Sequence, residues 1–258
     1  MRLWGRQAPE ALRETRIMMG MPITLDVAVP AARGLIDDAF AYFDAVDRRF
    51  STYKPDSEIS LINAGRLAPR DWSAEMTEVM TLAEETKRET DGYFDIRQPD
   101  GKLDPSGIVK GWAIRNAARV LDEASVADYF VEAGGDLQTR GKNPDGKEWS
   151  VGVRNPFNPR EIVKVIHPKG KGVATSGSYV RGQHIYDPHA PHRPVEGIVS
   201  LTVVGPDVYE ADRFATAAFA MGKAGVHFIE RLPGFEAYMI DGQGVATMTT
   251  GFKGYVPC

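Results

Sequence analysis

Asp212 and Thr216 stand four residues apart in the segment EADRFATAAFAMG at 210–222. The apolar periodicity of this segment predicts a helix from Val208 to Met221. Four-residue spacing puts two helical side chains on one face, one turn apart. A carboxylate next to a hydroxyl offers the hard oxygen atoms that Mg²⁺ binds in proteins. The same residues also fit a capped helix start in which Thr216 bonds to a backbone carbonyl, so the spacing leaves both interpretations open.

Two glycine-containing turns form a second candidate site. Gly134, Gly135 and Asp136 follow the strand-like run YFVEA, and Ser176 and Gly177 follow GVAT. Glycine at a strand end permits positive φ and lets a ligand approach the backbone closely. Two hairpin turns are the simpler interpretation, and a nucleotide pocket is the alternative. Neither GxGxxG nor GxxxxGK[ST] occurs, so a bound nucleotide would be held by another device.

Histidine chemistry is concentrated in one motif. His184, in GQHIYDP, precedes Asp187, and an imidazole titrating near neutrality can accept a proton from a hydroxyl. A structural role is the commoner one for a single histidine. His189 and His192 share the following loop, but no third ligand at suitable spacing completes a transition-metal site. The only cysteine is Cys258, which excludes a disulfide framework and a cysteine-metal site.

The bulk composition limits the possible partners. The 258 residues carry a net charge of −4 and show no basic run, which argues against a nucleic-acid surface. The first 20 residues lack the apolar stretch of a signal peptide or membrane span. We therefore expect no membrane span and a cytoplasmic location for the chain as given, with a periplasmic location open if a leader was removed.

The helices and strands that must position these residues are predicted to form an α+β fold. Residues 22–29 alternate like a strand, and helices are expected at 35–50, from Ser73 through 83, and after a turn at Gly107. From residue 128 onward, short apolar runs separated by glycine, proline and asparagine predict an antiparallel meander. It is interrupted by the 208–221 helix and a shorter one at 226–232. With no repeat and no linker, we expect one mixed domain, residues 1–258, in which several helices pack on the meander.

Eight segments, in order, resemble the FAD:protein FMN transferase family, often called ApbE. They are MMGMPITLDV, FSTYKPDSEISLIN, DGYFDI, LDPSGIVKGWAI, VEAGGDLQTRG, ATSGSY, HIYDP and SLTVVGPDVYEADRFATAAFAMG. The resemblance covers nearly the whole chain and implies an ApbE-like fold related to the T-fold. It further implies a Mg²⁺-dependent enzyme that takes FMN from its substrate FAD, attaches it to a threonine or serine of an acceptor flavoprotein, and releases AMP.

The resemblance also assigns roles to individual residues. It places Mg²⁺ on Asp212, Thr216 and the backbone carbonyl of Val109, and it makes His184 the base that activates the acceptor hydroxyl. An aromatic residue at the position of Tyr53 accompanies transfer in the family, whereas a small polar residue accompanies FAD hydrolysis. The implied flavin-binding set comprises Met19, Tyr53, Asp104, Ser106, Lys110, Gly134, Gly135, Asp136, Ser176 and Gly177.

Two departures from the family pattern bear on function. Only IRQPDGK (96–102) separates the FD motif from the DPSG motif, where family members have a longer stretch that helps to hold FAD. The HIYDP motif continues with HAPHRP, which lacks the usual Thr-Gly. Two alternatives to transfer therefore stay open: a pyrophosphatase that hydrolyses FAD to FMN and AMP, and a non-catalytic flavin-binding protein.

Overall fold

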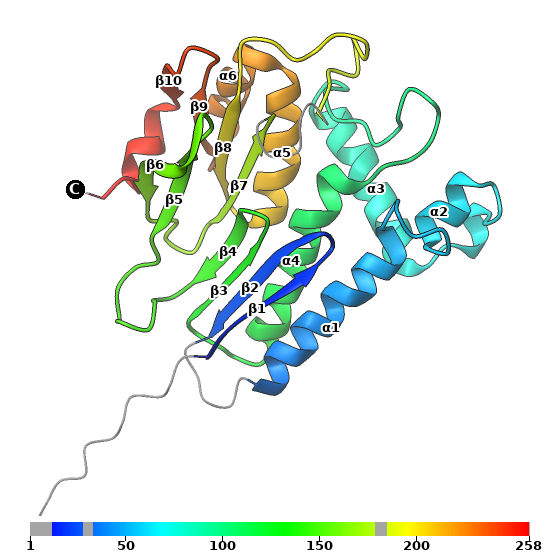
Figure 1. Cartoon of the computed structure of the whole chain (residues 1–258), viewed down its shortest axis with the longest axis horizontal. Helices are drawn as coiled ribbons and strands as arrows, with labels where there is room; N and C mark the ends of the chain where they lie inside the picture. Colours follow the sequence, from blue (N-terminus) through cyan, green and yellow to red (C-terminus); the bar gives the residue numbers. More distant parts are fainter. Residues whose placement is uncertain (1–11, 28–32, 179–184, 258) are drawn as a thin grey trace, which may run out of the picture.

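A single antiparallel sheet of eight strands organises the chain. The computed structural model describes residues 12–27, 33–178 and 185–257. Every neighbouring pair of strands in the sheet is antiparallel. In sheet order the strands are β1 (Leu12–Met18), β2 (Met21–Val27), β3 (Tyr129–Ala133), β4 (Asp136–Arg140), β7 (Gly172–Gly177), β8 (Ser200–Gly205), β9 (Glu236–Ile240) and β10 (Ala246–Met248) (Figure 1).

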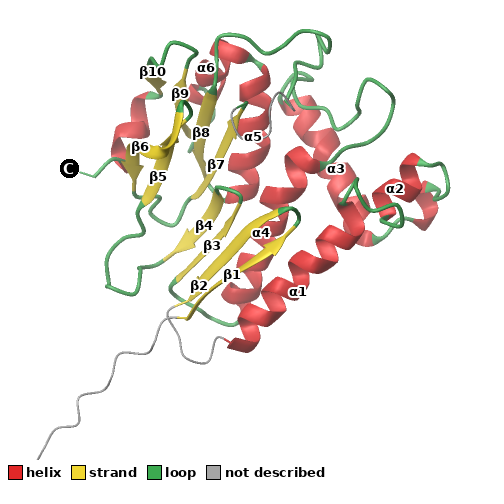
Figure 2. Ribbon diagram, viewed as in Figure 1, coloured by secondary structure: helices red, strands yellow, loops and turns green. Residues whose placement is uncertain are grey.

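The longer helices lie on one face of this sheet (Figure 2). The central pair, α4 (Ser106–Glu123) and α5 (Val208–Ala220), packs on β3, β4, β7 and β8, and α1 (Arg33–Phe50) packs on the outer side of α4. The remaining helices are α2 (Glu58–Asn63), α3 (Ala74–Glu89), α6 (Gly225–Glu230) and the 3₁₀ turns η2 (Pro69–Asp71), η3 (Gly222–Ala224) and η4 (Thr250–Tyr255). The architecture is the predicted mixed α+β fold.

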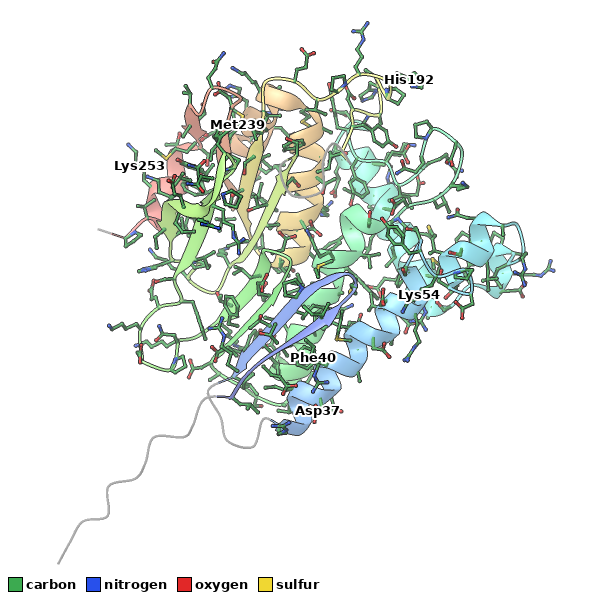
Figure 3. The ribbon with its side chains drawn as sticks, viewed as in Figure 1. Asp37, Phe40, Lys54, His192, Met239 and Lys253 are labelled. Atoms are coloured by element: carbon green, nitrogen blue, oxygen red, sulfur yellow. The ribbon has the colours of Figure 1, made fainter. Side chains whose placement is uncertain are left out.

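The predicted helices form because their apolar residues recur at helical spacing. In α1, Ile36, Phe40, Phe43 and Val46 are all buried, and Phe40 points inward beneath the guanidinium of Arg16 (Figure 3). Ser73 caps α3 as expected, since its hydroxyl accepts the N–H of Met76 at 3.1 Å.

The meander prediction was wrong in one respect. Strands β5 (Val151–Asn155) and β6 (Asn158–Ile166) leave the main sheet and pair only with each other among the described strands, so β4 pairs directly with β7. The hairpin folds back because Val153 and Ile166 are apolar. They pack in a cluster with Val204, on the sheet face opposite the one that α5 covers.

Three further elements differ from the expectations. Strand β1 and helix α2 were not predicted. The half-buried face of β1 carries Glu14 and Arg16, so the strand lacks apolar alternation, and α2 has only six residues. Helix α4 begins at Ser106, so Gly107 lies in its first turn and does not form a turn before the helix. Within the described ranges, no helix has the length and hydrophobicity required to cross a membrane.

Candidate active site

A cleft of about 710 Å³ opens where α4, α5 and the ends of several strands meet. This volume is within the range of small-molecule sites, roughly 300 to 1,000 Å³. Most of the predicted site residues line it: Asp104, Ser106, Lys110, Gly134, Gly135, Ser176, Gly177, Asp212 and Thr216. The structure thus brings together residues that are more than 100 positions apart in sequence.

The close approach of α4 to α5 forms the wall that carries Asp212. A Cβ added to Gly111 would lie 2.6 Å from the Cβ of Asp212, so only glycine lets the two helices come this close. The N–H of Gly111 donates to Asp212 Oδ2 at 2.8 Å. A metal ligand on a pocket face is expected to be solvated. Asp212 is instead only 3% exposed, so it is a buried residue on the cleft wall.

One turn further along α5, Thr216 contacts a different backbone oxygen from the predicted ligand, the Val109 carbonyl. Its hydroxyl donates to the carbonyl of Gly107 at 3.4 Å. The Val109 carbonyl lies inside α4, where it accepts a hydrogen bond of the helix itself. The helical partner of the Gly107 carbonyl would be the N–H of Gly111, but that N–H donates to Asp212. The carbonyl beside Thr216 is therefore that of Gly107, because α4 starts earlier than the sequence suggested.

A lysine joins two carboxylates next to this wall. The Lys110 ammonium lies 2.5 Å from Asp136 Oδ2 and 3.7 Å from Asp212 Oδ1. Burial raises the pKa of Asp212 well above its usual range, Lys110 lowers it, and the nearby Asp136 raises it further. Asp136 is fully buried, and its Oδ1 accepts the N–H of Thr175 at 2.9 Å, which ties β4 to β7.

The glycine pair forms the β3–β4 turn, with φ of 60° at Gly134 and 101° at Gly135. The hairpin-turn interpretation is confirmed, and the turn also lines the cleft, as the nucleotide-pocket alternative requires. A Cβ at Gly134 would lie 2.8 Å from the sulfur of Met21, so a larger residue would push the turn out of place. The turn exposes backbone to the cleft, as close ligand approach requires.

The first turn of α4 faces the same space. Asp104 accepts the N–H of Ser106 at 3.0 Å, and Ser106 is exposed at the cleft with Gly107 beside it. The start of a helix carries the positive end of its dipole, which favours negatively charged ligands such as phosphate.

Four predicted residues of the described part do not line the cleft, and two of them, Val109 and Asp136, are buried side chains of α4 and β4. Met19 lies in the β1–β2 turn with φ of 52°, and its neighbours Gly20 and Met21 line the cleft in its place. Tyr53 is 95% exposed between α1 and α2, and this geometry does not support its contact with a flavin. His184 lies outside the described residues.

Sequence reasoning missed several cleft residues. Arg13, Tyr93, Glu132 and Tyr186 all line it. Tyr93 and Tyr186 lie inside the quoted motifs DGYFDI and HIYDP, so their position was the available signal. Burial raises the pKa of Glu132, although the N–H of Gly135 donates to it at 2.6 Å and lowers it.

His189 and His192, the two histidines of the loop after HIYDP, have different surroundings. His189 packs edge-on against Tyr93 with ring centroids 4.7 Å apart, and its Nε2 lies 2.9 Å from the carbonyl of Asp91. His192 is exposed at the outer end of the loop (Figure 3). His189 therefore holds the loop against the cleft wall.

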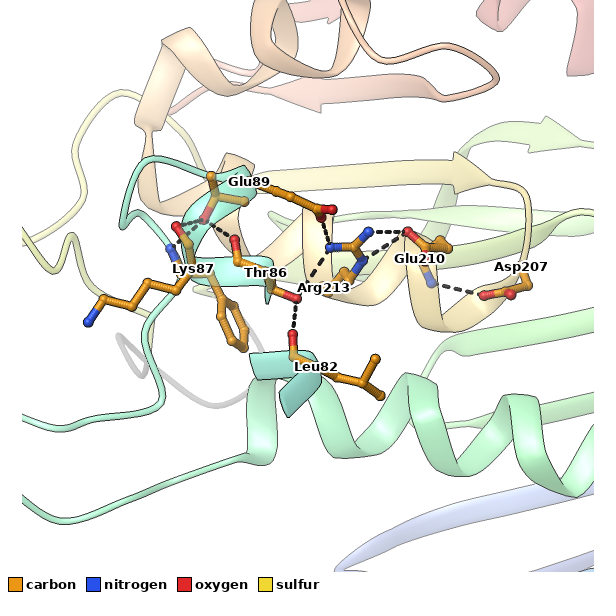
Figure 4. A network of polar contacts seen from close by, with 9 residues as sticks. Leu82, Thr86, Lys87, Glu89, Asp207, Glu210 and Arg213 are labelled. Carbon is orange, nitrogen blue, oxygen red and sulfur yellow. Dashed lines mark hydrogen bonds and ion pairs between the residues drawn. The ribbon is translucent and has the colours of Figure 1, made fainter. Parts of the chain in front are cut away.

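Helix α5 is fixed by a polar network around Arg213 (Figure 4). The guanidinium donates to Glu210 at 2.6 and 2.8 Å, to Thr86 at 3.3 Å, and to Glu89 at the end of α3. Asp207 caps the helix by accepting the N–H of Glu210. Because Arg213 follows Asp212 directly, this anchor also sets which way the Asp212 side chain faces.

The donor set at the cleft wall fits a hard divalent cation. No three His, Cys, Asp or Glu side chains converge anywhere in the described part of the chain, so a transition-metal cage is not formed there. Asp212, Thr216 and the Gly107 carbonyl instead present one carboxylate and two neutral oxygens. Mg²⁺ typically takes few protein ligands of this kind and keeps water and phosphate for the rest.

The chain is similar in sequence to a family model and to several curated proteins. A family model described as the ApbE family matches residues 19–99 and 97–239. The FAD:protein FMN transferase of Salmonella typhimurium is 29% identical, over 83% of this chain and 79% of that protein. The Escherichia coli K12 protein of the same name is 27% identical, over 78% and 75%.

Solved structures show the same fold. The flavin transferase ApbE of Vibrio cholerae has a TM-score of 0.83 and 24% identity, covering 96% of this chain and 99% of that one. The ApbE protein of Thermotoga maritima has a TM-score of 0.83 and 23% identity, covering 96% and 100%. Since the family model spans most of the sequence and the relatives are named as transferases, the chain belongs to the ApbE family and is an enzyme of the transferase class.

Proposed function

We propose that this chain transfers FMN from FAD to a threonine or serine hydroxyl of an acceptor flavoprotein and releases AMP. The observation that carries the proposal is the cleft wall where Asp212, Thr216 and the Gly107 carbonyl converge beside a glycine turn. The relatives named FAD:protein FMN transferase support the choice of substrate.

The cleft-wall oxygens have a defined part in this proposal. Asp212, Thr216 and the carbonyl of Gly107 would hold Mg²⁺, which fits the hard, mostly neutral character of the set. When bound there, the cation supplies Lewis-acid polarisation of the FAD pyrophosphate.

The chain's own residues bind and orient the substrate. The Gly134–Gly135 turn lets the ligand approach the backbone, and the positive end of the α4 dipole, at Ser106, faces the space where phosphate would lie. Lys110 adds a positive charge where the pyrophosphate would lie, held in place by Asp136 at 2.5 Å. Tyr93 and Tyr186 supply aromatic surface that restricts water.

The transfer step forms one bond and breaks one. The acceptor oxygen attacks the FMN-side phosphorus, an oxygen–phosphorus ester bond forms, and the anhydride bond to AMP breaks with its electron pair leaving on AMP. His184 takes the hydroxyl proton. A general base contributes typically 10² to 10⁴-fold, so we expect His184→Ala to slow transfer by roughly that factor without unfolding the protein.

The test is the mass of the acceptor. Purified protein is incubated with FAD, Mg²⁺ and a threonine-containing peptide, and intact mass is measured. We expect a gain equal to the mass of FMN less one water, which requires both Mg²⁺ and the hydroxyl, with a valine-for-threonine peptide as the control. Free FMN and AMP without an adduct would instead identify a pyrophosphatase, and unconsumed FAD would identify a binding protein.

A further inference from the structure

The β5–β6 hairpin carries half of the large exposed apolar side chains of the described residues. Phe157 is 56% exposed and Ile162 is 51% exposed, and Val163 and Val165 lie on the same strand. Val245 and Met248, at the neighbouring β9–β10 turn and edge strand, are exposed as well. A gathering of exposed apolar residues on two adjacent elements is typical of an interaction surface.

The two elements are in contact. A Cβ at Gly244 would lie 3.8 Å from the ring of Phe157, so the hairpin tip rests beside the β9–β10 turn. Figure 1 shows β5, β6, β9 and β10 together at one corner of the molecule, away from α1 and α2. We call the surface formed by Arg154, Phe157, Arg160, Ile162 and Val165 the hairpin face.

Register places the hairpin face at the rim of the cleft. Gly152 pairs with Val165 and Arg154 with Ile162, so these four residues project to the same side of the hairpin. Gly152 and Arg154 line the cleft. The side chain of Ile162 lies over Gly152, since a Cβ there would be 2.7 Å from its Cδ1. The apolar strip is therefore continuous with the cleft.

The charge of the hairpin differs in sign from that of the whole chain. Residues 151–166 contain Arg154, Arg160 and Lys164 against the single carboxylate Glu161, whereas the chain carries −4. Glu161 is already bonded to the amides of Asn155 and Asn158. Arg160 is exposed near the tip of the hairpin, between the paired residues Asn158 and Ile162.

Strand β6 also has an edge to which a further strand could add. Among the described residues β6 pairs only with β5, and a bulge at Val163 interrupts the ladder. The outer edge of such a strand presents unpaired N–H and C=O groups to an incoming extended segment.

We propose that the hairpin face docks the acceptor protein, by binding an extended segment rich in acidic and apolar residues next to the target hydroxyl. This rests on the proposed function, which requires a macromolecule to bring a hydroxyl into the cleft from its rim. The apolar strip buries the segment's apolar side chains, and Arg154 and Arg160 select its carboxylates.

The test uses a peptide library with one central threonine and random flanks, incubated with FAD and Mg²⁺. Peptides that gain the mass of FMN less one water are sequenced. We expect the wild type to label peptides with acidic and apolar flanks. Arg160→Glu should shift this preference towards basic flanks and raise the KM of the best acidic peptide about fivefold. FAD affinity should not change, because Arg160 does not line the cleft.

A matched variant controls for net charge. Arg70→Glu makes the same change at an exposed arginine in η2, across the molecule from the hairpin, and should leave the labelled set unaltered. Phe157→Ser should raise the KM of acidic and basic peptides alike. Identical labelled sets from wild type, Arg160→Glu and Phe157→Ser would overturn the docking proposal while transfer itself stood. A wild type that consumes FAD but labels no peptide would refute transfer and docking together.

Discussion

At the scale of single residues, Asp212 is the most informative side chain. We expect Asp212→Asn to lower turnover at limiting Mg²⁺ by roughly a hundredfold or more, because the charged oxygen is lost from the cleft wall. Asp207→Asn is the matched control on the same helix, since asparagine caps a helix as well as aspartate does. Steady-state kinetics over a Mg²⁺ series distinguishes them, and equal activity of the two variants would exclude Asp212 as a ligand.

Asp26 provides a test of electrostatics outside the cation site. It is buried in β2, its Oδ1 has no hydrogen-bond partner in the described part of the chain, and Arg13 lies 3.6 Å away. Burial raises the pKa of Asp26 above its ordinary value of 3.8, and Arg13 only partly offsets this. The native state thus keeps a proton that the unfolded chain has lost.

The free energy of unfolding should therefore fall as pH rises from about 4 through the folded pKa of Asp26. Asp26→Asn lacks this titration, so its stability relative to wild type should increase over the same interval. Urea unfolding at pH 4, 5, 6 and 7 measures the difference. A difference that stayed constant with pH would show that the Asp26 carboxyl is not perturbed.

At the scale of elements, the contact of α4 with α5 determines the site. Gly111→Ala would place a methyl group 2.6 Å from the Cβ of Asp212 and 2.8 Å from the carbonyl of Val208. We expect a loss of about 1 to 3 kcal/mol in the free energy of unfolding and a loss of activity. Gly34→Ala, in α1 with open space around it, should be neutral or stabilising by up to about 1 kcal/mol. Denaturant unfolding compares the two alanines.

The Arg213 network makes a similar prediction for α3 and α5. Arg213→Met keeps the apolar stem but leaves Glu210 and Glu89 without their cation, so we expect a loss of about 1 to 3 kcal/mol in unfolding free energy. Arg48→Met, which removes an exposed pair with Asp44, should change it by less than about 0.5 kcal/mol. Equal effects of the two substitutions would show that the network is not an anchor.

Particular residues show how far the sequence alone could lead. Helical periodicity located α1, α3, α4 and α5, and the Asp212–Thr216 spacing identified the cleft wall, because both signals are local. The Gly107 carbonyl was missed because helix starts shift by a residue or two, and one residue changes which oxygen is exposed. Lys110 lies between two carboxylates of β4 and α5, a tertiary relation that no local pattern contains.

The departure of the β5–β6 hairpin from the sheet was also beyond local patterns. Its strands have the same alternation and turn residues as those that stay in the sheet. Only the packing of Val153 and Ile166 on the far side of the sheet decides their position.

At the scale of the whole molecule, the short connection at 96–102 leads to a prediction about how the adenine half of FAD would be held. In the structure it is a small hairpin closed by a bridge between Arg97 and Leu103, and only Ile96 and Gln98 from it reach the cleft. We expect the isolated chain to bind FAD no more than about tenfold tighter than FMN. Flavin fluorescence titrations measure both affinities. FAD binding tighter by roughly a thousandfold would contradict this prediction.

The order of strands in the sheet has a consequence during synthesis. Strand β2 leaves the ribosome early, but its inner partner β3 lies about 100 residues later in the chain, beyond α1 to α4. At roughly 5 to 20 residues per second this is an interval of about 5 to 20 seconds. Over that interval the inner edge of β2 has no partner strand for its backbone N–H and C=O groups. An unpaired strand edge tends to pair with other chains, so we expect the β1–β2 hairpin to need protection until β3 is made.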